Sequence, residues 1–307
     1  MLAIVCPGQG SQTPGFLTPW LEVPGVRGRL ETLGAAAELD LVAHGTTSDA
    51  DTIKDTAVAQ PLIVAAGLAT LPAVLPGGLD RAITAGHSVG EITAAAAAGV
   101  ISDRDAMVFV RERGRGMAAA SAARPTGMSA VVGGAEDEVV AAIERHGLTA
   151  ANRNGAGQIV AAGTLDQLEA LAADPPAKAR VIPLAVAGAF HTEHMAPAVD
   201  ALATLADTMT THAPRATVLS NKDGASVRSG DEVLARLVNQ VSNPVRWDLT
   251  MATLLDLGVT GLIELPPAGT LVGLAKRGMK GVETLALKTP DDLDKAQAMV
   301  REHGQEA

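Results

Sequence analysis

The sequence predicts an α/β protein in which a mostly parallel sheet is covered by helices and a smaller βαββαβ unit is inserted. Short apolar or β-branched runs alternate with longer helical patterns along the chain, which is typical of parallel sheets. Hydrophobic types make up 47% of the 307 residues and charged types 19%, a globular composition. With three Phe, two Trp and no Tyr, the small aliphatic residues and Gly must fill the core, which suits close helix–sheet packing.

The first half of the larger unit alternates strands and helices. We expect strands over 2–6 and 82–85, a Gly-rich turn over 7–10, and helices over 56–70, 89–98 and 103–119. Ser102 or Asp103 is expected to cap the last of these helices. Further along, we expect helices over 194–211, 232–240 and 248–257, and a strand over 261–265.

A different order of elements appears in the middle of the chain. Strands are predicted over 128–132, 148–152, 158–162 and 179–184, and helices over 136–145 and 165–172. This β-α-β-β-α-β order is that of a ferredoxin-like unit, which closes on itself and can be inserted into another domain. We therefore expect a ferredoxin-like subdomain over 124–187 and a catalytic subdomain formed by 1–123 and 188–307.

Composition excludes several classes of function. The formal net charge is −10 and aromatic residues are scarce, which argues against a nucleic-acid-binding protein. The single cysteine, Cys6, cannot form an intrachain disulfide. The start of the chain lacks a basic targeting region, and the longest apolar stretch, 62–79, is interrupted by Pro72 and Pro76. We read that stretch as a core helix and a loop, and we expect a cytoplasmic protein with no membrane span.

The segment Gly86-His87-Ser88-Val89-Gly90 follows a predicted strand and precedes an alanine-rich helical pattern. In this G-x-S-x-G arrangement, the serine lies on a tight strand-to-helix turn, and the glycines leave room for crowded backbones. The next N–H, that of Val89, lies at a helix N-terminus, where it favours an oxyanion. Ser88 is therefore predicted to be a catalytic nucleophile.

A second Gly-rich turn, Pro7-Gly8-Gln9-Gly10-Ser11-Gln12, directly follows the first strand. It does not match a dinucleotide-binding loop, because Thr13 stands where the third Gly is needed, and no Gly-Lys-Ser/Thr follows for a P-loop. The turn either supplies a second oxyanion donor or is a plain connection.

Two of the seven histidines, His191 and His194, stand out because their segment opens a helix after a strand. Their late place in the chain suits a base that follows the nucleophile, whereas the side chain of His87 should point away from Ser88. His191 and His194 alone do not make a metal site, and no C-x-x-C or H-x-x-x-H accompanies them. We expect neither a metal nor a cofactor.

Five motifs together resemble the malonyl-CoA:acyl carrier protein transacylases of bacterial fatty-acid synthesis and the acyltransferase domains of polyketide synthases. The resemblance runs from about residue 3 to about residue 290. In chain order the motifs are Gly8-Gln9-Gly10-Ser11-Gln12, Gly86-His87-Ser88-Val89-Gly90-Glu91, Arg113-Gly114, Ala189-Phe190-His191-Thr192 and Gln240-Val-Ser-Asn243-Pro244-Val-Arg-Trp247. The resemblance implies an α/β-hydrolase-like large subdomain with a ferredoxin-like small one.

The resemblance also implies roles for individual residues. Ser88 corresponds to the nucleophile and His191 to the general base, while the carbonyl of Gln240 orients the histidine. The backbone N–H groups of Gln9 and Val89 correspond to the oxyanion hole. Arg113 corresponds to the group that grips the malonyl carboxylate, and the substrate-binding residues are expected to be Arg113, Phe190, Met117 and Gln9.

The sequence departs from the family at two places. The family often has Glu-x-Gly-Pro-Gly near the C-terminus, where this chain has Glu264-Leu-Pro-Pro-Ala-Gly269. Many stand-alone members have serine where Phe190 stands. In synthase domains Ala-Phe-His accompanies the choice of malonyl and Ala-Ser-His that of methylmalonyl.

The implied partners are malonyl-CoA and an acyl carrier protein that binds transiently, and the family suggests a monomer. Because carrier proteins are generally acidic, a local basic patch is expected, either around Lys276, Arg277 and Lys280 or around Arg111 and Arg115. Two other functions remain open from the residues alone. One is a serine hydrolase or thioesterase on the same turn, and the other is a non-catalytic module that docks a carrier protein.

Overall fold

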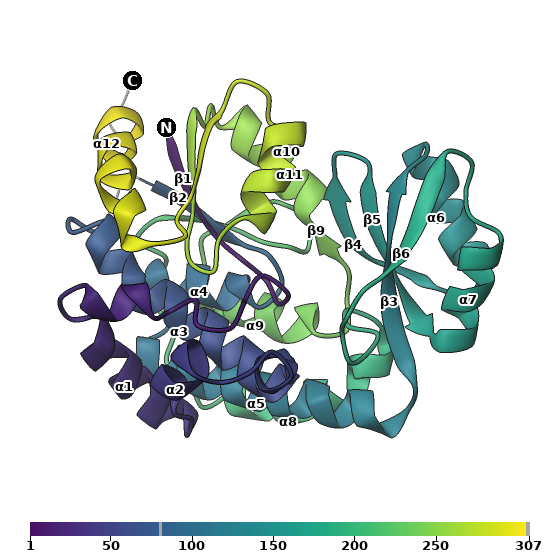
Figure 1. Cartoon of the computed structure of the whole chain (residues 1–307), viewed down its shortest axis with the longest axis horizontal. Coiled ribbons are helices and arrows are strands. Elements are labelled where there is room, and N and C mark those ends of the chain that lie inside the picture. Colours follow the sequence, from purple (N-terminus) through teal and green to yellow (C-terminus); the bar gives the residue numbers. More distant parts are fainter. Residues whose placement is uncertain (80–81, 305–307) are drawn as a thin grey trace.

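A computed structural model describes residues 1–79 and 82–304. Two sheets organise it, with helices around the larger one and a smaller helix-backed sheet beside it (Figure 1). In the first sheet the strand order is β11-β10-β1-β2-β7-β8. All of its neighbouring strands pair in parallel except the last two, which are antiparallel. Its strands are β1 (Leu2–Cys6), β2 (Ala82–Gly86), β7 (Thr217–Leu219), β8 (Ser226–Val227), β10 (Gly261–Glu264) and β11 (Glu283–Ala286).

The side chains of β1 alternate between two cores, as the period of a strand buried on both faces requires. Leu2, Ile4 and Cys6 face the larger core, whereas Ala3 and Val5 face the smaller one. The larger core is covered by α1 (Val26–Ala37), α2 (Leu41–Thr46), α3 (Thr56–Val74), α4 (Gly90–Ala97), α5 (Asp103–Ala123), α8 (Val199–Ala206), α9 (Gly230–Gln240) and α12 (Leu293–His303). The smaller core is covered by α10 (Trp247–Asp256) and α11 (Thr270–Gly278).

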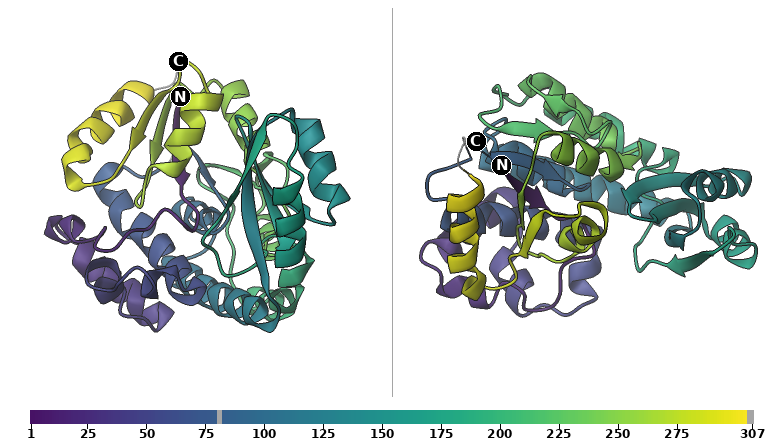
Figure 2. Two further views of the ribbon diagram at one scale, coloured as in Figure 1. Left: turned by 45° about the vertical axis from the view of Figure 1, so that its right-hand side comes forward. Right: turned by 90° about the horizontal axis from the view of Figure 1, so that it is seen from above.

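The second sheet has the strand order β6-β3-β5-β4-β9. Its strands are β3 (Thr126–Gly133), β4 (Thr149–Gly155), β5 (Gln158–Thr164), β6 (Ala179–Pro183) and β9 (Val245–Arg246). Helices α6 (Glu136–Arg145) and α7 (Leu165–Ala173) cover one face, while side chains of the other face join the larger core. Figure 2 shows this sheet projecting to one side of the molecule. The α/β class with two sheets is confirmed, while the division at 124–187 stays a prediction; β9 joins this sheet from outside that range.

Helix α3 is long and apolar enough to span a membrane by composition, but 72% of its most apolar window is buried inside the fold. Its burial fits the predicted core helix. Helix α5 begins at the expected place because the Ser102 hydroxyl accepts a hydrogen bond from the Asp105 N–H at 3.0 Å.

The single long helix predicted over 194–211 is wrong. A 3-10 turn over Glu193–Ala198 precedes α8, which ends at Ala206. Pro197 lies inside this turn and has no N–H to donate to an α-helical hydrogen bond, and the α-helix begins only after it, at Val199. Three other short 3-10 turns lie at Pro19–Glu22, Thr52–Lys54 and Pro290–Asp292.

Candidate active site

Ser88 occupies a strained turn between β2 and α4. Its φ of 53° lies in the left-handed region that non-glycine residues rarely adopt. A Cβ on Gly86 would lie 2.0 Å from the carbonyl of Gly90, and a Cβ on Gly90 would lie 2.2 Å from the carbonyl oxygen of Cys6. Only glycine therefore fits at both positions, and the turn presents the serine hydroxyl beyond the end of the strand.

His191 lies next to this hydroxyl although it is 103 residues away in sequence. Its Nε2 is 2.7 Å from Ser88 Oγ, and its Nδ1 is 2.8 Å from the backbone oxygen of Gln240. Because a carbonyl oxygen only accepts, the proton belongs on Nδ1, which leaves the Nε2 lone pair facing the serine. Burial and then the charge of Arg113 lower the pKa of His191 to about 3. The neutral imidazole of His191 can therefore take the proton of Ser88 as the serine attacks an acyl group.

Arg113 is 1% exposed and points from α5 toward the same hydroxyl. Its Nη1 donates to Gln60 Oε1 at 2.7 Å, and its Nη2 donates to Gln240 Oε1 at 2.9 Å and lies 3.5 Å from Ser88 Oγ. Burial lowers the pKa of Arg113 to about 10. Over residues 1–79 and 82–304, no carboxylate forms an ion pair with it and its Nε has no hydrogen-bond partner. A buried guanidinium whose direct partners are neutral is suited to a carboxylate of the substrate.

The Gly-rich loop after β1 packs against the turn that carries Ser88. A Cβ on Gly8 would lie 3.0 Å from the carbonyl oxygen of His87. Within the described ranges, neither the N–H of Gln9 nor that of Val89 donates a hydrogen bond. Both donors are therefore available at the loops that surround the serine.

The two remaining predicted residues are buried nearby. Met117 lies one turn beyond Arg113 on α5, and its sulfur is 3.5 Å from Gln60 Nε2. Phe190 precedes His191 and is 6% exposed. The Gln9 amide oxygen lies 3.4 Å from Gln60 Nε2, so Gln60 links the loop after β1 to the guanidinium of Arg113.

The side chain of His87 contacts the smaller sheet. Its Nε2 is 2.8 Å from Asn154 Oδ1, and Asn154 Nδ2 donates to Gln158 Oε1 at 2.9 Å. The ring of His87 packs edge-on against Trp247, with centroids 5.6 Å apart. The β4–β5 hairpin thus touches the residue before Ser88.

Three buried polar residues of the site carry no prediction from sequence: Gln60, Glu91 and Asn221. Gln60 lies in the apolar helix α3 and Glu91 in the alanine-rich helix α4, whereas Asn221 lies in a polar segment just after β7. Such placement signals a polar network, although the partners are distant in sequence.

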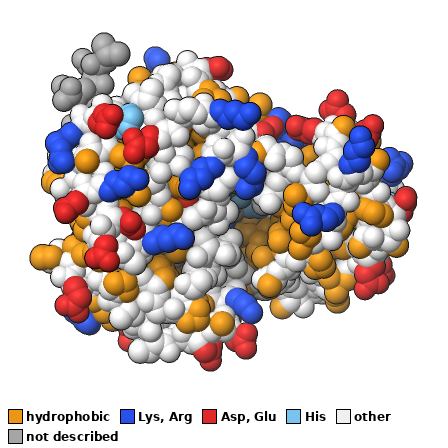
Figure 3. All heavy atoms as spheres, turned by 45° about the horizontal axis from the view of Figure 1, so that its top comes forward, with side chains coloured by type: hydrophobic (Ala, Val, Ile, Leu, Met, Phe, Trp, Pro, Cys, Tyr) orange, Lys and Arg blue, Asp and Glu red, His pale blue; other side chains and the backbone are white. Residues whose placement is uncertain are grey.

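The surface cations differ in their partners. Arg111 and Arg115 form ion pairs with Glu38 and Glu112. Lys276 and Arg277 are exposed in the last turn of α11, where a Cβ on Gly278 would contact Ala156 of the β4–β5 hairpin. Figure 3 shows a hollow near the centre of one face, with hydrophobic side chains in it and Lys or Arg side chains at several points around it.

The loop that begins at Glu264, where the sequence differs from the family pattern, has a structural function. The carboxylate of Glu264 accepts hydrogen bonds from the N–H groups of Gly269, Leu271 and Val272, at 2.8 to 3.0 Å. It therefore satisfies donors at the start of α11 that have no partner inside the helix.

Comparison with known proteins gives one family. Residues 3–300 match the acyl transferase domain family. The malonyl CoA-acyl carrier protein transacylase of Mycobacterium tuberculosis strain H37Rv is 54% identical over 299 residues, which cover 96% of this chain and 98% of that protein. The transacylase of the same description from Escherichia coli K12 is 34% identical and covers 94% of this chain and 96% of its own length.

Solved structures give the same result. The crystal structure of MCAT from Mycobacterium tuberculosis superposes with a TM-score of 0.92 and covers 97% of this chain and 99% of its own. A type II PKS acyl-carrier protein in complex with its malonyl-transacylase matches with a TM-score of 0.90 at 30% identity, over 97% of this chain and 99% of that one. The chain therefore belongs to the acyl transferase domain family and, within it, to the malonyl-CoA:acyl carrier protein transacylases.

Proposed function

We infer that this chain transfers a malonyl group from CoA to the phosphopantetheine thiol of an acyl carrier protein, through a malonyl-serine at Ser88. The reaction feeds chain extension in fatty-acid or polyketide synthesis. One observation supports this assignment above the others: Ser88 Oγ lies 2.7 Å from His191 Nε2 and 3.5 Å from Arg113 Nη2. A nucleophile, a base and a carboxylate-binding cation thus meet at one oxygen.

The first half-reaction forms the acyl-enzyme. His191 takes the proton of Ser88 as the serine oxygen attacks the thioester carbonyl carbon. The carbonyl oxygen becomes negative and accepts hydrogen bonds from the N–H groups of Gln9 and Val89, each worth about 3 kcal/mol in comparable sites. The C–S bond then breaks, and the CoA sulfur leaves with the proton held by His191.

The second half-reaction reverses these steps with a different thiol. His191 removes the proton of the phosphopantetheine thiol, whose sulfur attacks the malonyl-serine carbonyl. A second oxyanion forms at the same two N–H groups and collapses as the Ser88 oxygen leaves and regains its proton from His191. Malonyl is then attached to the carrier protein, and the enzyme is restored.

Arg113 gives the acyl group its fixed position. A guanidinium can bind a carboxylate through two parallel hydrogen bonds, which holds the malonyl group and disfavours random attack by water. The bound carboxylate also offsets the charge that contributes to the low pKa of His191. Malonyl binding therefore makes the base stronger at the step that needs it.

For the carrier protein, we propose docking at the exposed cations of the last turn of α11, Lys276 and Arg277. This turn adjoins the β4–β5 hairpin, which contacts His87 beside the nucleophile. Arg111 and Arg115 suit this role less, because their charges are offset by Glu38 and Glu112. We further propose that the protein is a cytoplasmic monomer.

The test is incubation of the protein with malonyl-CoA in the absence of a carrier protein. A transacylase stops after one equivalent of CoA is released and gains the mass of one malonyl group on Ser88. Continuous release of malonate would indicate a hydrolase, and the absence of any acylation would indicate a non-catalytic docking module. The Ser88→Ala variant is the control, since it lacks the acyl acceptor.

A further inference from the structure

Glu91 is a buried carboxylate that the reaction steps above do not use. It lies in the first turn of α4, three residues after the nucleophile, and is 3% exposed. Its Oε1 accepts a hydrogen bond from the Asn221 N–H at 2.9 Å, and its Oε2 accepts one from Gln240 Nε2. These two hydrogen bonds favour the ionised form, whereas burial opposes it.

The two donors to Glu91 each contact the catalytic groups. Asn221 Oδ1 accepts from the N–H of Ser88 at 2.8 Å. Gln240 accepts from His191 through its backbone oxygen at 2.8 Å and from Arg113 through its side-chain oxygen at 2.9 Å. Glu91 is therefore connected to Ser88, His191 and Arg113 through one intervening residue in each case.

The amide of Gln240 lies between two opposite charges. Its NH₂ group faces the carboxylate of Glu91, and its oxygen faces the guanidinium of Arg113. A reversed amide would place oxygen against oxygen at Glu91 and N–H against N–H at Arg113. Both charges thus select one orientation, while the neutral amide keeps the carboxylate out of direct contact with Arg113.

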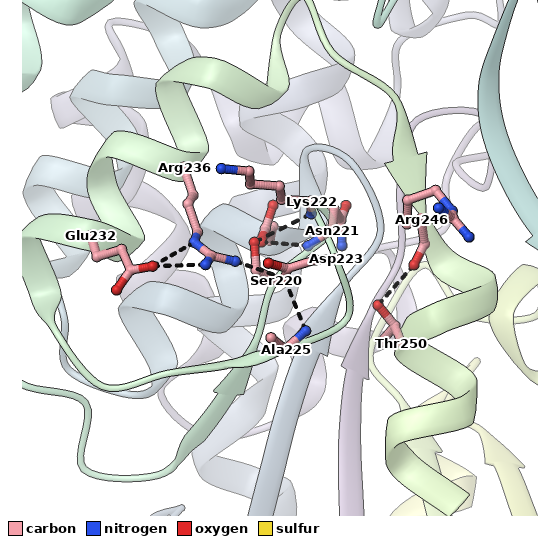
Figure 4. A network of polar contacts seen from close by, with 10 residues as sticks. Ser220, Asn221, Lys222, Asp223, Ala225, Glu232, Arg236, Arg246 and Thr250 are labelled. Carbon is pink, nitrogen blue, oxygen red and sulfur yellow. Dashed lines mark hydrogen bonds and ion pairs between the residues drawn. The ribbon is translucent and has the colours of Figure 1, made fainter.

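The loop that carries Asn221 is anchored on the helix that carries Gln240. Arg236, one turn before Gln240 on α9, donates to Asp223 at 2.7 Å and is held by Glu232 on its other side (Figure 4). The backbone N–H of Arg246 donates to the backbone oxygen of Asn221 at 2.7 Å. These contacts hold the loop after β7 on α9 and β9, and the hydrogen bond from the Asn221 N–H to Glu91 ties the same loop to α4.

We propose that Glu91 is a positioning residue for malonyl transfer, acting through Gln240 and Asn221 to hold His191, Arg113 and Ser88 in their reactive arrangement. This inference rests on the proposed reaction at Ser88. The carboxylate must be ionised, because only then do both oxygens accept hydrogen bonds without a competing proton.

The ionisation of Glu91 predicts a pH dependence. Among the described residues, the charged group that faces Glu91 is Arg113 of α5, while Ser220, Asn221 and Gln240 contribute neutral contacts. Burial raises the pKa of Glu91 to about 7, whereas the pKa of His191 is lowered to about 3. The rate of Ser88 malonylation should therefore rise with pH through the neutral range as Glu91 loses its proton.

The experiment measures single-turnover malonylation of Ser88 by rapid quench and intact-mass spectrometry, from pH 5.5 to 8.5. In Glu91→Gln, an NH₂ group replaces an acceptor and opposes the N–H of Gln240 or of Asn221. We expect the rate to fall about 10- to 100-fold, the range found for outer residues that orient metal ligands. The half-saturating concentration of malonyl-CoA should change less than the maximal single-turnover rate. The rise of the rate with pH near neutrality, the pH limb, should disappear. Glu91→Asp keeps the charge and should retain the limb at an intermediate rate.

Glu264→Gln is the matched control, since Glu264 is also a buried carboxylate but, among the residues that the structure describes, it accepts only from the start of α11. It should lower the melting temperature and leave the pH limb unchanged. A wild-type rate and pH limb in Glu91→Gln would overturn the inference, as would loss of the limb in Glu264→Gln. If Glu91→Gln does not fold, a Glu91→Asp variant identical to wild type in rate and limb would overturn it.

These outcomes are separate from failure of the proposed function. If the wild-type protein forms no malonyl-Ser88, the proposed function fails. Normal wild-type malonylation with an unaffected Glu91→Gln variant overturns only the role of Glu91.

Discussion

The imidazole of His191 donates from Nδ1 to the backbone oxygen of Gln240 at 2.8 Å. A neutral acceptor here fixes the ring and its tautomer, but it supplies no negative charge to stabilise an imidazolium. With burial and the charge of Arg113 acting in the same direction, the histidine stays neutral at physiological pH. A neutral base is the form that can accept the serine proton.

This low pKa predicts an acid-dependent loss of stability. The pKa is near 6.5 in the unfolded chain and about 3 in the folded protein, so between these values the unfolded state binds more protons. The stability that the neutral His191 contributes is complete above pH 6.5. It is lost as the pH falls toward 3, by at most about 1.4 kcal/mol per pH unit. Between pH 6.5 and pH 5, the free energy of unfolding in urea should decrease by about 1.6 kcal/mol more in wild type than in His191→Gln. Equal losses in the two proteins would contradict this.

Replacement of Arg113 by Ala should remove malonyl selectivity. Charge-assisted hydrogen bonds to a carboxylate contribute about 1.5–3 kcal/mol each, so kcat/KM for malonyl-CoA should fall by at least about 10-fold. Acetyl-CoA, which has no free carboxylate, should be accepted as well as before or better. Arg111→Ala, on the same helix but in surface ion pairs, is the control. Malonyl transfer at the wild-type rate in Arg113→Ala would exclude the proposed carboxylate contact.

Phe190→Ser should broaden the acyl range. Phe190 is 6% exposed and adjoins the base, so its truncation opens space beside the acyl group. Methylmalonyl-CoA turnover should increase relative to malonyl-CoA, while stability decreases by about 3 kcal/mol, as for other buried phenylalanines. Competition between the two thioesters, read as the ratio of acyl-Ser88 masses, measures the effect. An unchanged ratio would show that Phe190 does not limit the acyl side chain.

Gly90→Ala should disrupt the turn that presents Ser88. The added Cβ would lie 2.2 Å from the oxygen of Cys6 and 2.6 Å from that of Pro7, both in the backbone, so the chain itself must shift. We expect a loss of about 1–3 kcal/mol or more in unfolding free energy and a large drop in acylation rate. Gly28→Ala is the opposite case, because nothing lies within 4 Å of its Cβ in helix α1, and it should stabilise by about 0.5–1 kcal/mol. Similar effects of the two substitutions would refute the crowding argument.

Charge reversal at Lys276 and Arg277 tests the docking site. The double variant Lys276→Glu and Arg277→Glu should raise the KM for an acidic carrier protein several-fold at low salt and leave Ser88 malonylation by malonyl-CoA unchanged. The double variant Lys295→Glu and Arg301→Glu, at two exposed cations of α12, serves as the charge-matched control. An unaltered KM in the double variant would place the docking surface elsewhere.

Local spacing was enough to predict the strand-to-helix turn at Ser88, because that turn depends on glycines only two residues away on either side. The α/β class likewise follows from the alternation of strands and helices. No helix is predicted over 26–37, where Gly28 and Gly34 weaken the helical pattern. The long helix expected from His194 onward begins only at Val199, because Pro197 lies in the preceding 3-10 turn. Tertiary packing determines the outcome in the first case and a missing N–H in the second.

The polar network was the part that sequence reasoning could not assemble. Glu91 is 130 positions away from Asn221 and 149 positions away from Gln240 in the sequence. No local pattern indicates that these residues pair. The roles expected of Gln240 and Arg113 are those that the resemblance to a family implies. To predict Gln60 and Asn221 would require knowing which buried amides lack a partner nearby in the sequence.

Cys6, at the end of β1, is fully buried, and that burial raises the pKa of its thiol to about 12. Thiolate is the reactive species, so the folded protein offers no sulfhydryl to an electrophile near neutral pH. A colorimetric disulfide reagent added to the reaction would therefore report the CoA liberated by the first half-reaction, free of any background from the protein.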